Sequence, residues 1–548
     1  MLPPPKLAAL RRYIGLSKTG SNAHIQAVRK FLEGDHWQDG LGWVGPSLPS
    51  DDPNAAAVMA KIRRDFVSKN LVREAVIRHR DAVLGDEANW GFSPVRTALS
   101  DGPPPEQELI DEAEAALTQW WDRQRVWQEI QAAFFDAIGT GKGVLRLFIP
   151  KAATLIDEEG RSYVPQGTLE EVLAAIRLKR ADRDAAGIAR DEDGEPVATW
   201  FDFRDSRGYT KSEIQFLDEQ GNTVVLIEGK RDEFAASIYP LDGNFLIYEI
   251  DLEPLITPQA VSQQKLINKA LTMLSRNVDT GGFVERTILN GQMPGEWKED
   301  ANGRKIWQPA PFEVGPGVTN FIRGVSYEDA DGNKRFAPVD IRYRDPVSVE
   351  TFRDTRLEAT AAFYDEVRQT FMMISGDATA SGKSRIQATQ DFLSSLEPTA
   401  RALEAALRWL FTTVLRWAAF FMDNARPDRY DPIRPVIHPV IRAVQMTPEE
   451  ITADLQLRDG GVISTETLMR RSGRVQDPDA ERARIAQEMR ERWVYADPFE
   501  RVAALAAALS AGLYSKREAL LLDGNTPEEA ARIIQEQLEE SQARLPMP

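Results

Sequence analysis

The stretch TPQAVSQQKLINKALTMLSRN, residues 257–277, is the most informative part of this 548-residue chain. Thr257 followed by Pro258 is a strong helix start, because threonine caps helices well and proline fits the first helical turn. The helix is predicted to run to about Val278, because the glycine pair at 281–282 then ends it. At about 1.5 Å per residue, this helix is a rod about 30 Å long.

A second helix is predicted from near Asp345-Pro346 to about Phe371. It would be about 37 Å long by the same rise per residue. The segment 283–345 between the two helices has strand-and-turn character, as in FVERTILNGQMPGEW and DADGNKRFAPVDIRYR. Two rods of similar length that enclose a small β-rich insert predict an antiparallel helix pair with a small domain at its tip.

The part of the chain before this pair changes from helices to strands near residue 142. Ser21 and Asn70 are expected to cap two of its helices. Thr168 and Glu171 form the pattern of a capping box before a short charged helix. Alternating apolar residues predict strands at 143–150, 198–203, 212–219, 223–229 and 244–250.

The part after the pair begins with a very long helix, predicted from about Lys383 to Met422. Leucines at 396, 403 and 410 recur every seven residues, which provides an apolar seam for another helix. Pro398 should bend the long helix. A proline-rich extended segment follows, and short, well-capped helices are predicted from Thr447 onward. The fold class is therefore expected to be α+β and mainly helical.

The segment MMISGDATASGKSRIQ, residues 372–387, contains a Gly-Lys-Ser ending that nucleotide-binding loops share. Such a loop needs four residues between its first glycine and the Gly-Lys pair, and it must follow a buried strand. Here Gly376 and Gly382 are separated by five residues, and the preceding FYDEVRQTFMM is helical in pattern. GTGKG at 139–143 has the reverse order, helix before strand. Both patterns disfavour an NTPase, which leaves a hinge or a plain surface connection at 374–384.

Helix 258–278 carries Lys265, Lys269 and Arg276 and no acidic residue. At 100° per residue, these three cations fall within about 40° of one another. Ile267, Leu271, Leu274 and Val278 centre on the opposite side, which we expect to pack. The cationic side has two interpretations: solvated side chains that give solubility, or a face that passes close to phosphate groups. The second predicted helix mixes charges of both signs, which suits contacts between neighbouring copies.

Composition excludes several classes of function. The formal charge of −17 disfavours a general nucleic-acid coat, which needs a basic face. The chain has no cysteine, and its four histidines lie far apart, so disulfides, zinc clusters and a histidine metal site are not expected. No apolar run reaches the roughly 20 residues of a membrane span, so a soluble protein is expected. No catalytic constellation is recognisable, and we expect neither an enzyme nor a cofactor.

Several stretches, taken in order, resemble the portal proteins of long-tailed bacteriophages. The early ones are VREAVIRHRDAVLGDEANWGFSP at 72–94 and WWDRQRVWQEIQAAFFDAIGTGKGVLRLFI at 120–149. The first rod at 257–277 is similar to that family's first stem helix, and GKSRIQATQDFLSSLEP at 382–398 to the start of its long helix. GVISTETLMRRSGRVQDPDAERARIAQEM at 461–489 is similar to a stretch near the end of such proteins. Each motif alone is weak, but their order is specific.

The resemblance implies a ring, typically of twelve subunits, at one vertex of the viral capsid. Double-stranded DNA would be pumped through its channel by a separate terminase, retained, and later released into the tail. The implied partners are terminase, head-tail adaptors, and the major capsid and scaffolding proteins; the ring would be made in the host cytoplasm. The implied division is 1–255 wing, 256–282 first stem helix, 283–345 clip, 346–373 second stem helix, 374–384 tunnel loop, 385–455 wing and 456–548 crown.

The resemblance also implies functional positions, and none of them is catalytic, metal-binding or cofactor-binding. The DNA-facing tunnel loop would comprise Ser375, Gly376, Asp377, Thr379, Ser381, Gly382, Lys383 and Ser384. The channel-lining residues of the stem would be Lys265, Lys269 and Arg276. Trp297 and Trp307 would bind partners at the clip. The alternatives are another large virion assembly protein, such as a scaffold or adaptor, and a packaging ATPase or a nuclease.

Overall fold

The structure, a computed structural model, describes most of the chain up to residue 460. The described residues are 4–18, 23–37, 55–95, 106–150, 155–156, 162–163, 167–205, 207–228, 234–282, 286–292, 295–299, 303–309, 323–343, 347–374, 382–424, 426–439, 441 and 448–460, with isolated positions between 464 and 532. They form a mixed α/β structure, about half helical, with several small antiparallel sheets.

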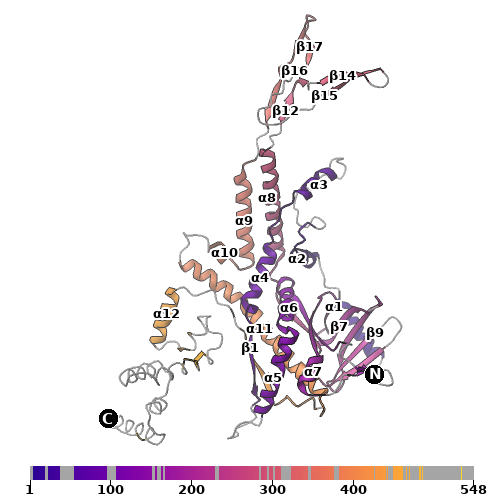
Figure 1. Ribbon diagram of the computed structural model, residues 1–548, viewed down its shortest axis with the longest axis vertical. Helices are drawn as coiled ribbons and strands as arrows, with labels where there is room; N and C mark the ends of the chain where they lie inside the picture. Colours follow the sequence, from indigo (N-terminus) through magenta and orange to yellow (C-terminus); the bar gives the residue numbers. More distant parts are fainter. Residues whose placement is uncertain are drawn as a thin grey trace. The chain divides into compact units, whose positions relative to one another are not determined.

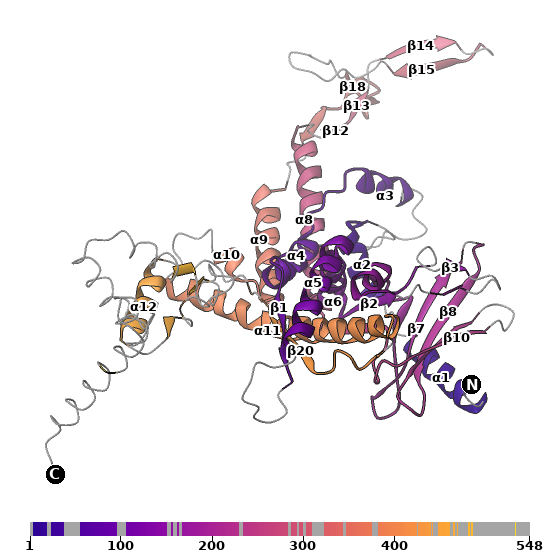
Figure 2. The ribbon, with the colours of Figure 1, turned by 60° about the horizontal axis from the view of Figure 1, so that its bottom comes forward.

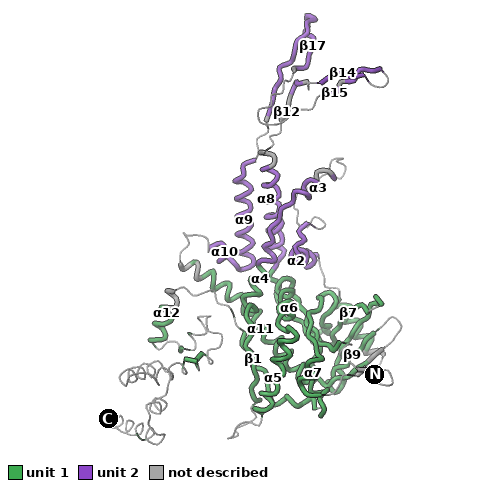
Figure 3. The backbone as a smooth tube through the Cα atoms, in the orientation of Figure 1, with its two compact units in different colours: residues 1–22, 75–255, 377–548 green, residues 23–74, 256–376 purple. Residues whose placement is uncertain are grey.

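The chain divides into two compact units, each built from separate parts of the sequence (Figure 3). Unit 1 comprises residues 1–22, 75–255 and 377–548, and unit 2 comprises residues 23–74 and 256–376.

Unit 2 is organised around two helices that lie side by side, α8 (Pro258–Gly282) and α9 (Val349–Glu366) (Figure 1). Near one end, the Thr257 hydroxyl donates to Glu366 at 2.6 Å. Near the other, the Asn277 side chain donates to the carbonyl of Val347 at 2.7 Å and accepts from its amide at 3.0 Å. Because the start of one helix is tied to the end of the other, the pair is antiparallel. This confirms the predicted helix at 258–278 and the predicted antiparallel pair.

The second helix ends earlier than predicted. α9 stops at Glu366, and a separate short helix, α10 (Phe371–Ile374), follows. Arg368 has a φ of 53°, its amide donates to Asp365, and the Gln369 amide donates to the carbonyl of Tyr364 at 2.7 Å. These bonds form a Schellman motif, which closes a helix. The prediction of one continuous helix to Phe371 was wrong because the left-handed position holds arginine instead of glycine.

The segment between α8 and α9 forms two-stranded antiparallel ribbons, as predicted. They are β12 (Arg286–Leu289) with β19 (Asp340–Tyr343), β13 (Gly291–Gln292) with β16 (Arg323–Gly324), β14 (Gly295–Glu299) with β15 (Lys305–Pro309), and β17 (Ser326–Glu328) with β18 (Lys334–Phe336).

A buried row of polar side chains on α8 holds the other part of unit 2. Gln264, Asn268 and Thr272 recur every four residues and are fully buried. The Gln264 carbonyl oxygen accepts from the amides of Leu71 at 2.8 Å and Val72 at 3.3 Å, the first residues of α4 (Leu71–Leu84). The Gln264 amide nitrogen donates to the Lys69 carbonyl at 2.7 Å and to Asn268 at 2.9 Å.

The remaining members of the row make similar bonds. Asn268 bonds to the buried ring of His36 at 2.9 Å, and the Thr272 hydroxyl lies 3.1 Å from the Val67 amide. Asn70 caps α4 as predicted, accepting from the Arg73 amide at 2.9 Å. The polar row therefore lies beside the buried apolar residues of α8, such as Val261 and Ile267, and adds hydrogen bonds to its packing. Unit 2 also includes α2 (Ala23–Glu33) and α3 (Ala55–Arg64).

Unit 1 contains a five-stranded antiparallel sheet in the order β10-β9-β8-β7-β6. Its strands are β6 (Ala186–Arg190), β7 (Pro196–Arg204), β8 (Thr210–Leu217), β9 (Thr223–Glu228) and β10 (Phe234–Tyr239). Helix α1 (Pro4–Ser17) packs its apolar side, including Leu10 and Ile14, against Trp200 and Ile214 of this sheet. The strands predicted at 198–203, 212–219 and 223–229 are confirmed, and β6 and β10 were not predicted.

Tight turns with the pattern Asp-x-x-Gly-x connect β6 to β7, β7 to β8, β8 to β9 and, in unit 2, β17 to β18. In each, one carboxylate oxygen accepts from the amides two and four residues later. The aspartates are Asp191, Asp205, Asp218 and Asp329. The four turn glycines have φ values between 78° and 86°, which glycine adopts at little cost.

A three-stranded antiparallel sheet, β11-β2-β5, forms the other part of the unit 1 core. Its strands are β2 (Lys142–Phe148), β5 (Arg177–Ala181) and β11 (Ile247–Asp251). Helix α6 (Val126–Thr140) contacts all three strands, and α5 (Gln107–Gln124) contacts α6 and α7 (Leu169–Ala175). The capping box at the start of α7 is confirmed: Thr168 and Glu171 exchange hydrogen bonds. β2 and β11 were predicted, and β5 was not.

The predicted long helix is confirmed as α11, Gly382–Phe420, with Pro398 inside it. Its leucines at 396, 403 and 410 are fully buried, and Trp409 donates to the Phe245 carbonyl at 2.9 Å. Figure 2 shows α11 running past the strand pair β1 (Asn89–Pro94) and β20 (Ile433–His438). The structure also has α12 (Pro448–Asp459) and the short pair β3 (Leu155–Ile156) and β4 (Ser162–Tyr163).

Candidate functional site

The three cations of α8 are partly exposed in the structure. No described carboxylate forms an ion pair with Lys265 or Lys269. They lie beside the buried polar row, which occupies the face of the helix that packs. The one acidic residue of α8, Asp279, follows Arg276 by three residues but Lys269 by ten, so the ammonium groups of Lys265 and Lys269 can approach an anion at little cost in broken ion pairs.

The apolar side of α8 is only partly covered. Ile267 is buried and Leu271 and Leu274 are half-buried, but Val278 is 61% exposed. The expectation that Val278 packs was therefore wrong for the single chain. The reason is that the polar contacts to residues 67–72 cover α8 only as far as Thr272. The exposed surface of α9 mixes charges, as predicted: Arg353, Asp354 and Glu358 are all exposed.

The ribbons between α8 and α9 expose large apolar side chains. Trp297 is 63% exposed, and Ile306 on the paired strand is 54% exposed. The other exposed apolar side chains on or beside these ribbons are Leu289, Val325, Tyr327, Phe336 and Ile341. Trp307 lies opposite Trp297 in the strand register, but its side chain lies outside the described residues. Isolated two-stranded ribbons are at best marginally stable in water.

The predicted tunnel loop falls mostly outside the described residues. This applies to Ser375, Gly376, Asp377, Thr379 and Ser381. Gly382, Lys383 and Ser384 form the first turn of α11, where Ser384 is exposed. The segment before the loop is α10, a helix, so the strand that a phosphate-binding loop requires does not precede it.

The second glycine-rich candidate, GTGKG at 139–143, has a structural explanation. Gly141 ends α6 with a φ of 86° and leads into β2. A Cβ on Gly143 would lie 2.1 Å from the carbonyl oxygen of Ala133, so β2 approaches α6 too closely for any side chain. These glycines therefore permit a turn and a close helix–strand contact.

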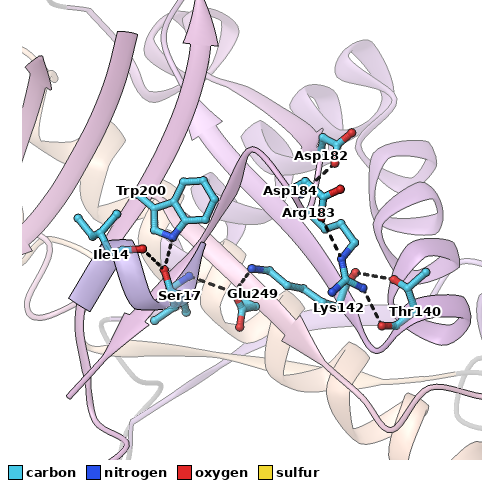
Figure 4. A network of polar contacts seen from close by, with 10 residues as sticks. Ile14, Ser17, Thr140, Lys142, Asp182, Arg183, Asp184, Trp200 and Glu249 are labelled. Atoms are coloured by element: carbon cyan, nitrogen blue, oxygen red, sulfur yellow. Dashed lines mark hydrogen bonds and ion pairs between the residues drawn. The ribbon is translucent and has the colours of Figure 1, made fainter. Parts of the chain in front are cut away.

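A polar cavity of about 370 Å³ in unit 1 was not predicted from the sequence. It lies between the end of α1 and strands β2, β6, β7 and β11. At its floor the Lys142 ammonium is 2.9 Å from Glu249, and the Trp200 ring nitrogen donates to Ser17 at 2.8 Å (Figure 4). No sequence motif indicates this site, because its residues come from five separate segments.

A larger groove of about 690 Å³ runs along α11 and β20, also in unit 1. Arg416 makes a two-pronged ion pair with Asp431 at 2.6 and 2.9 Å, and Arg408 pairs with Glu404 at 2.6 Å. These charges are matched within the groove, so it shows no preference for a charged ligand. Pro435 lies in the middle of β20 and lacks an amide donor, which makes that strand a poor template for another strand.

Among the described residues, no group of three or more histidine, aspartate or glutamate side chains is arranged to hold a metal ion. None of the helices in the described part of the chain has the length and apolar character of a membrane span. Comparison of the sequence with protein-family models and with curated protein sequences gives no match.

Proposed function

We propose that this chain is a subunit of a phage portal, a ring that conducts double-stranded DNA through one vertex of a capsid. The observation that carries the proposal is the element order from residue 258 onward. A helix, a set of ribbons, an antiparallel partner helix, a connecting segment and a 39-residue helix with an internal proline follow one another. In this proposal α8 and α9 are the stem, the ribbons are the clip, and residues 374–384 are the tunnel loop.

The exposed apolar side chains of the ribbons support an assembly of many copies. In a ring, neighbouring copies would cover side chains such as Trp297 and Ile306 and so remove their apolar surface from water. A closed ring needs two different complementary faces on each subunit, and the mixed charges on α9 suit such contacts.

The charge distribution supports a conduit over a DNA-binding protein. Each phosphate that a protein neutralises adds affinity, and affinity impedes sliding. A chain with a net charge of −17 and a short row of cations on α8 would attract DNA weakly. In this proposal Lys265, Lys269 and Arg276 face the channel.

Electron microscopy of the purified protein tests the assembly. We expect closed rings with a central hole, whereas monomers or open filaments would contradict the proposal. Ile306→Ser and Ile238→Ser form a matched pair, because the two isoleucines are 54% and 57% exposed on strands of different units. Ile306→Ser should lower the fraction of rings, and Ile238→Ser should not; equal effects would show that the ribbons are not the assembly surface.

Shortening residues 374–384 tests the channel. Rings should still form, but packaging or retention of DNA should fail. Normal packaging by shortened rings would show that this segment is only a connection. A DNA-stimulated ATPase activity that is lost in Lys383→Ala would favour the packaging-motor alternative.

A further inference from the structure

The 370 Å³ cavity of unit 1 has a cationic lining in an acidic protein. Four cationic side chains line it, and only two carboxylates do. The cations are Lys18, Lys142, Arg183 and Arg190, and the carboxylates are Asp184 and Glu249. Because the chain as a whole carries −17, this local excess of positive charge runs against the composition. Focused positive potential in a concave site attracts anions.

The floor of the cavity is an oriented ion pair. Glu249 accepts from the Ile188 amide at 3.0 Å and faces the Lys142 ammonium at 2.9 Å. Both side chains are largely buried, 19% exposed for Lys142 and 13% for Glu249. The pair fits because residue 187 is glycine: a Cβ there would lie 2.3 Å from the Lys142 nitrogen and 3.0 Å from a Glu249 oxygen.

The ammonium groups of Lys18 and Lys142 both lie near the ring of Trp200. The Lys18 nitrogen lies 4.6 Å from the centre of the Trp200 ring, and the Lys142 nitrogen lies 5.8 Å from it. Lys18 also pairs with Asp202 at 2.7 Å. Trp200 itself is 1% exposed, so its ring offers no surface on which a base could stack. Recognition in this cavity therefore depends on charge and hydrogen bonding.

Two guanidinium groups also line the cavity: Arg183, which is 11% exposed and lies 3.7 Å from Asp184, and Arg190 at the rim. Arg183 donates to the Thr140 carbonyl at 2.7 Å, and Arg190 donates to the Gly194 carbonyl at 3.1 Å. No described carboxylate forms an ion pair with Arg190, whose side chain is exposed. Guanidinium groups bind phosphate and carboxylate through paired hydrogen bonds.

We propose that this cavity binds a small molecule that carries a phosphate or carboxylate group, held between Lys18, Lys142 and Arg190. The volume of 370 Å³ lies near the lower end of the range of about 300–1,000 Å³ for small-molecule sites. The rim is solvated and the floor cations already have partners. We therefore expect dissociation constants of about 0.1–10 mM for simple oxyanions.

Calorimetric titration of the full-length protein with inorganic pyrophosphate and, separately, with citrate tests the proposal. Ionic strength is kept constant with chloride. Saturable binding of either probe is expected, and the arm with the higher affinity identifies phosphate or carboxylate as the preferred group. Absence of saturable binding of both probes below about 30 mM would overturn the proposal.

Three variants locate the binding. Arg190→Gln should weaken it by about tenfold, because one charge-assisted contact is lost. Gly187→Ala should abolish it by displacing the Lys142–Glu249 pair. Arg11→Gln is the matched control, because Arg11 lies on α1 but pairs with Glu228 outside the cavity. Circular dichroism checks the fold of each variant. Wild-type affinity in Arg190→Gln, or equal weakening in Arg11→Gln, would refute this location.

Discussion

Replacing Gln264 with leucine should loosen the start of α4. The Gln264 side chain makes four hydrogen bonds in a fully buried position, two of them shorter than 2.9 Å to backbone groups of Leu71 and Lys69. Leucine has a similar size but leaves these two backbone groups with only the long 3.2 Å contact from the Leu71 amide to the Lys69 carbonyl. An orphaned buried polar group costs about 1–3 kcal/mol, so the two together give a loss of about 4 kcal/mol.

Hydrogen exchange monitored by mass spectrometry measures this loss locally. A change of about 4 kcal/mol in the opening free energy raises the exchange rate of amides near 71–72 by about a thousandfold. Urea unfolding of the same variant reports the global effect.

Gln259→Leu is the matched control, because Gln259 lies on the same helix and is exposed. A surface substitution of this kind changes stability by less than about 0.5 kcal/mol. If the amides of residues 69–73 exchange at the same rate in Gln264→Leu and Gln259→Leu, the buried polar row does not hold α4.

The remaining predictions concern a histidine, a glycine and an aspartate of unit 1. Burial lowers the pKa of His79 to about 4, so the unfolded chain, with a histidine pKa near 6.5, binds more protons and stability falls with acidification. Between pH 7 and pH 5, urea unfolding should show the wild type losing about 2 kcal/mol more than His79→Gln, and equal losses would contradict this. Gly143→Ala should lower the free energy of unfolding by about 1–3 kcal/mol, because its Cβ would meet the Ala133 carbonyl. Gly15→Ala, which meets nothing within 4 Å in α1, should instead stabilise by about 0.5–1 kcal/mol, and a similar loss in both would refute the steric argument. Asp218→Ala should speed amide exchange at Gln220 and Asn222, whereas Asp218→Asn should retain much of the protection, since its carbonyl oxygen still accepts; no difference between them would contradict the role of this side chain.

The elements that the sequence predicted are those with strong local signals. Thr257-Pro258 marks the start of α8, and the capping box at Thr168 marks the start of α7. The end of α9 was missed because its closing position holds Arg368, and arginine gives no sign of a left-handed conformation. Strand β5 was missed because its charged, half-exposed sequence, RLKRA, is specified by pairing with β2.

The candidate sites were predictable to different extents. The cations on α8 follow from helical spacing alone, so the sequence was enough to find Lys265 and Lys269. The burial of Gln264 was not predictable, because a glutamine in the polar run Ser262–Lys265 is expected to face solvent, and its partner Lys69 lies 195 residues away. The cavity at Lys142 depends on the meeting of α1 with four strands, and such long-range contacts have no local pattern.

The Asp-x-x-Gly-x turn between β17 and β18 bears on how copies of this chain would meet. Asp329 fixes that turn with bonds confined to five residues, so the alignment of Tyr327 with Arg335 is decided before any outside contact exists. A neighbouring molecule would then contact a two-stranded ribbon whose strand register is already formed. Association would then lose little conformational entropy. Shifts of the strand register would be rare even where many copies of this ribbon lie close together.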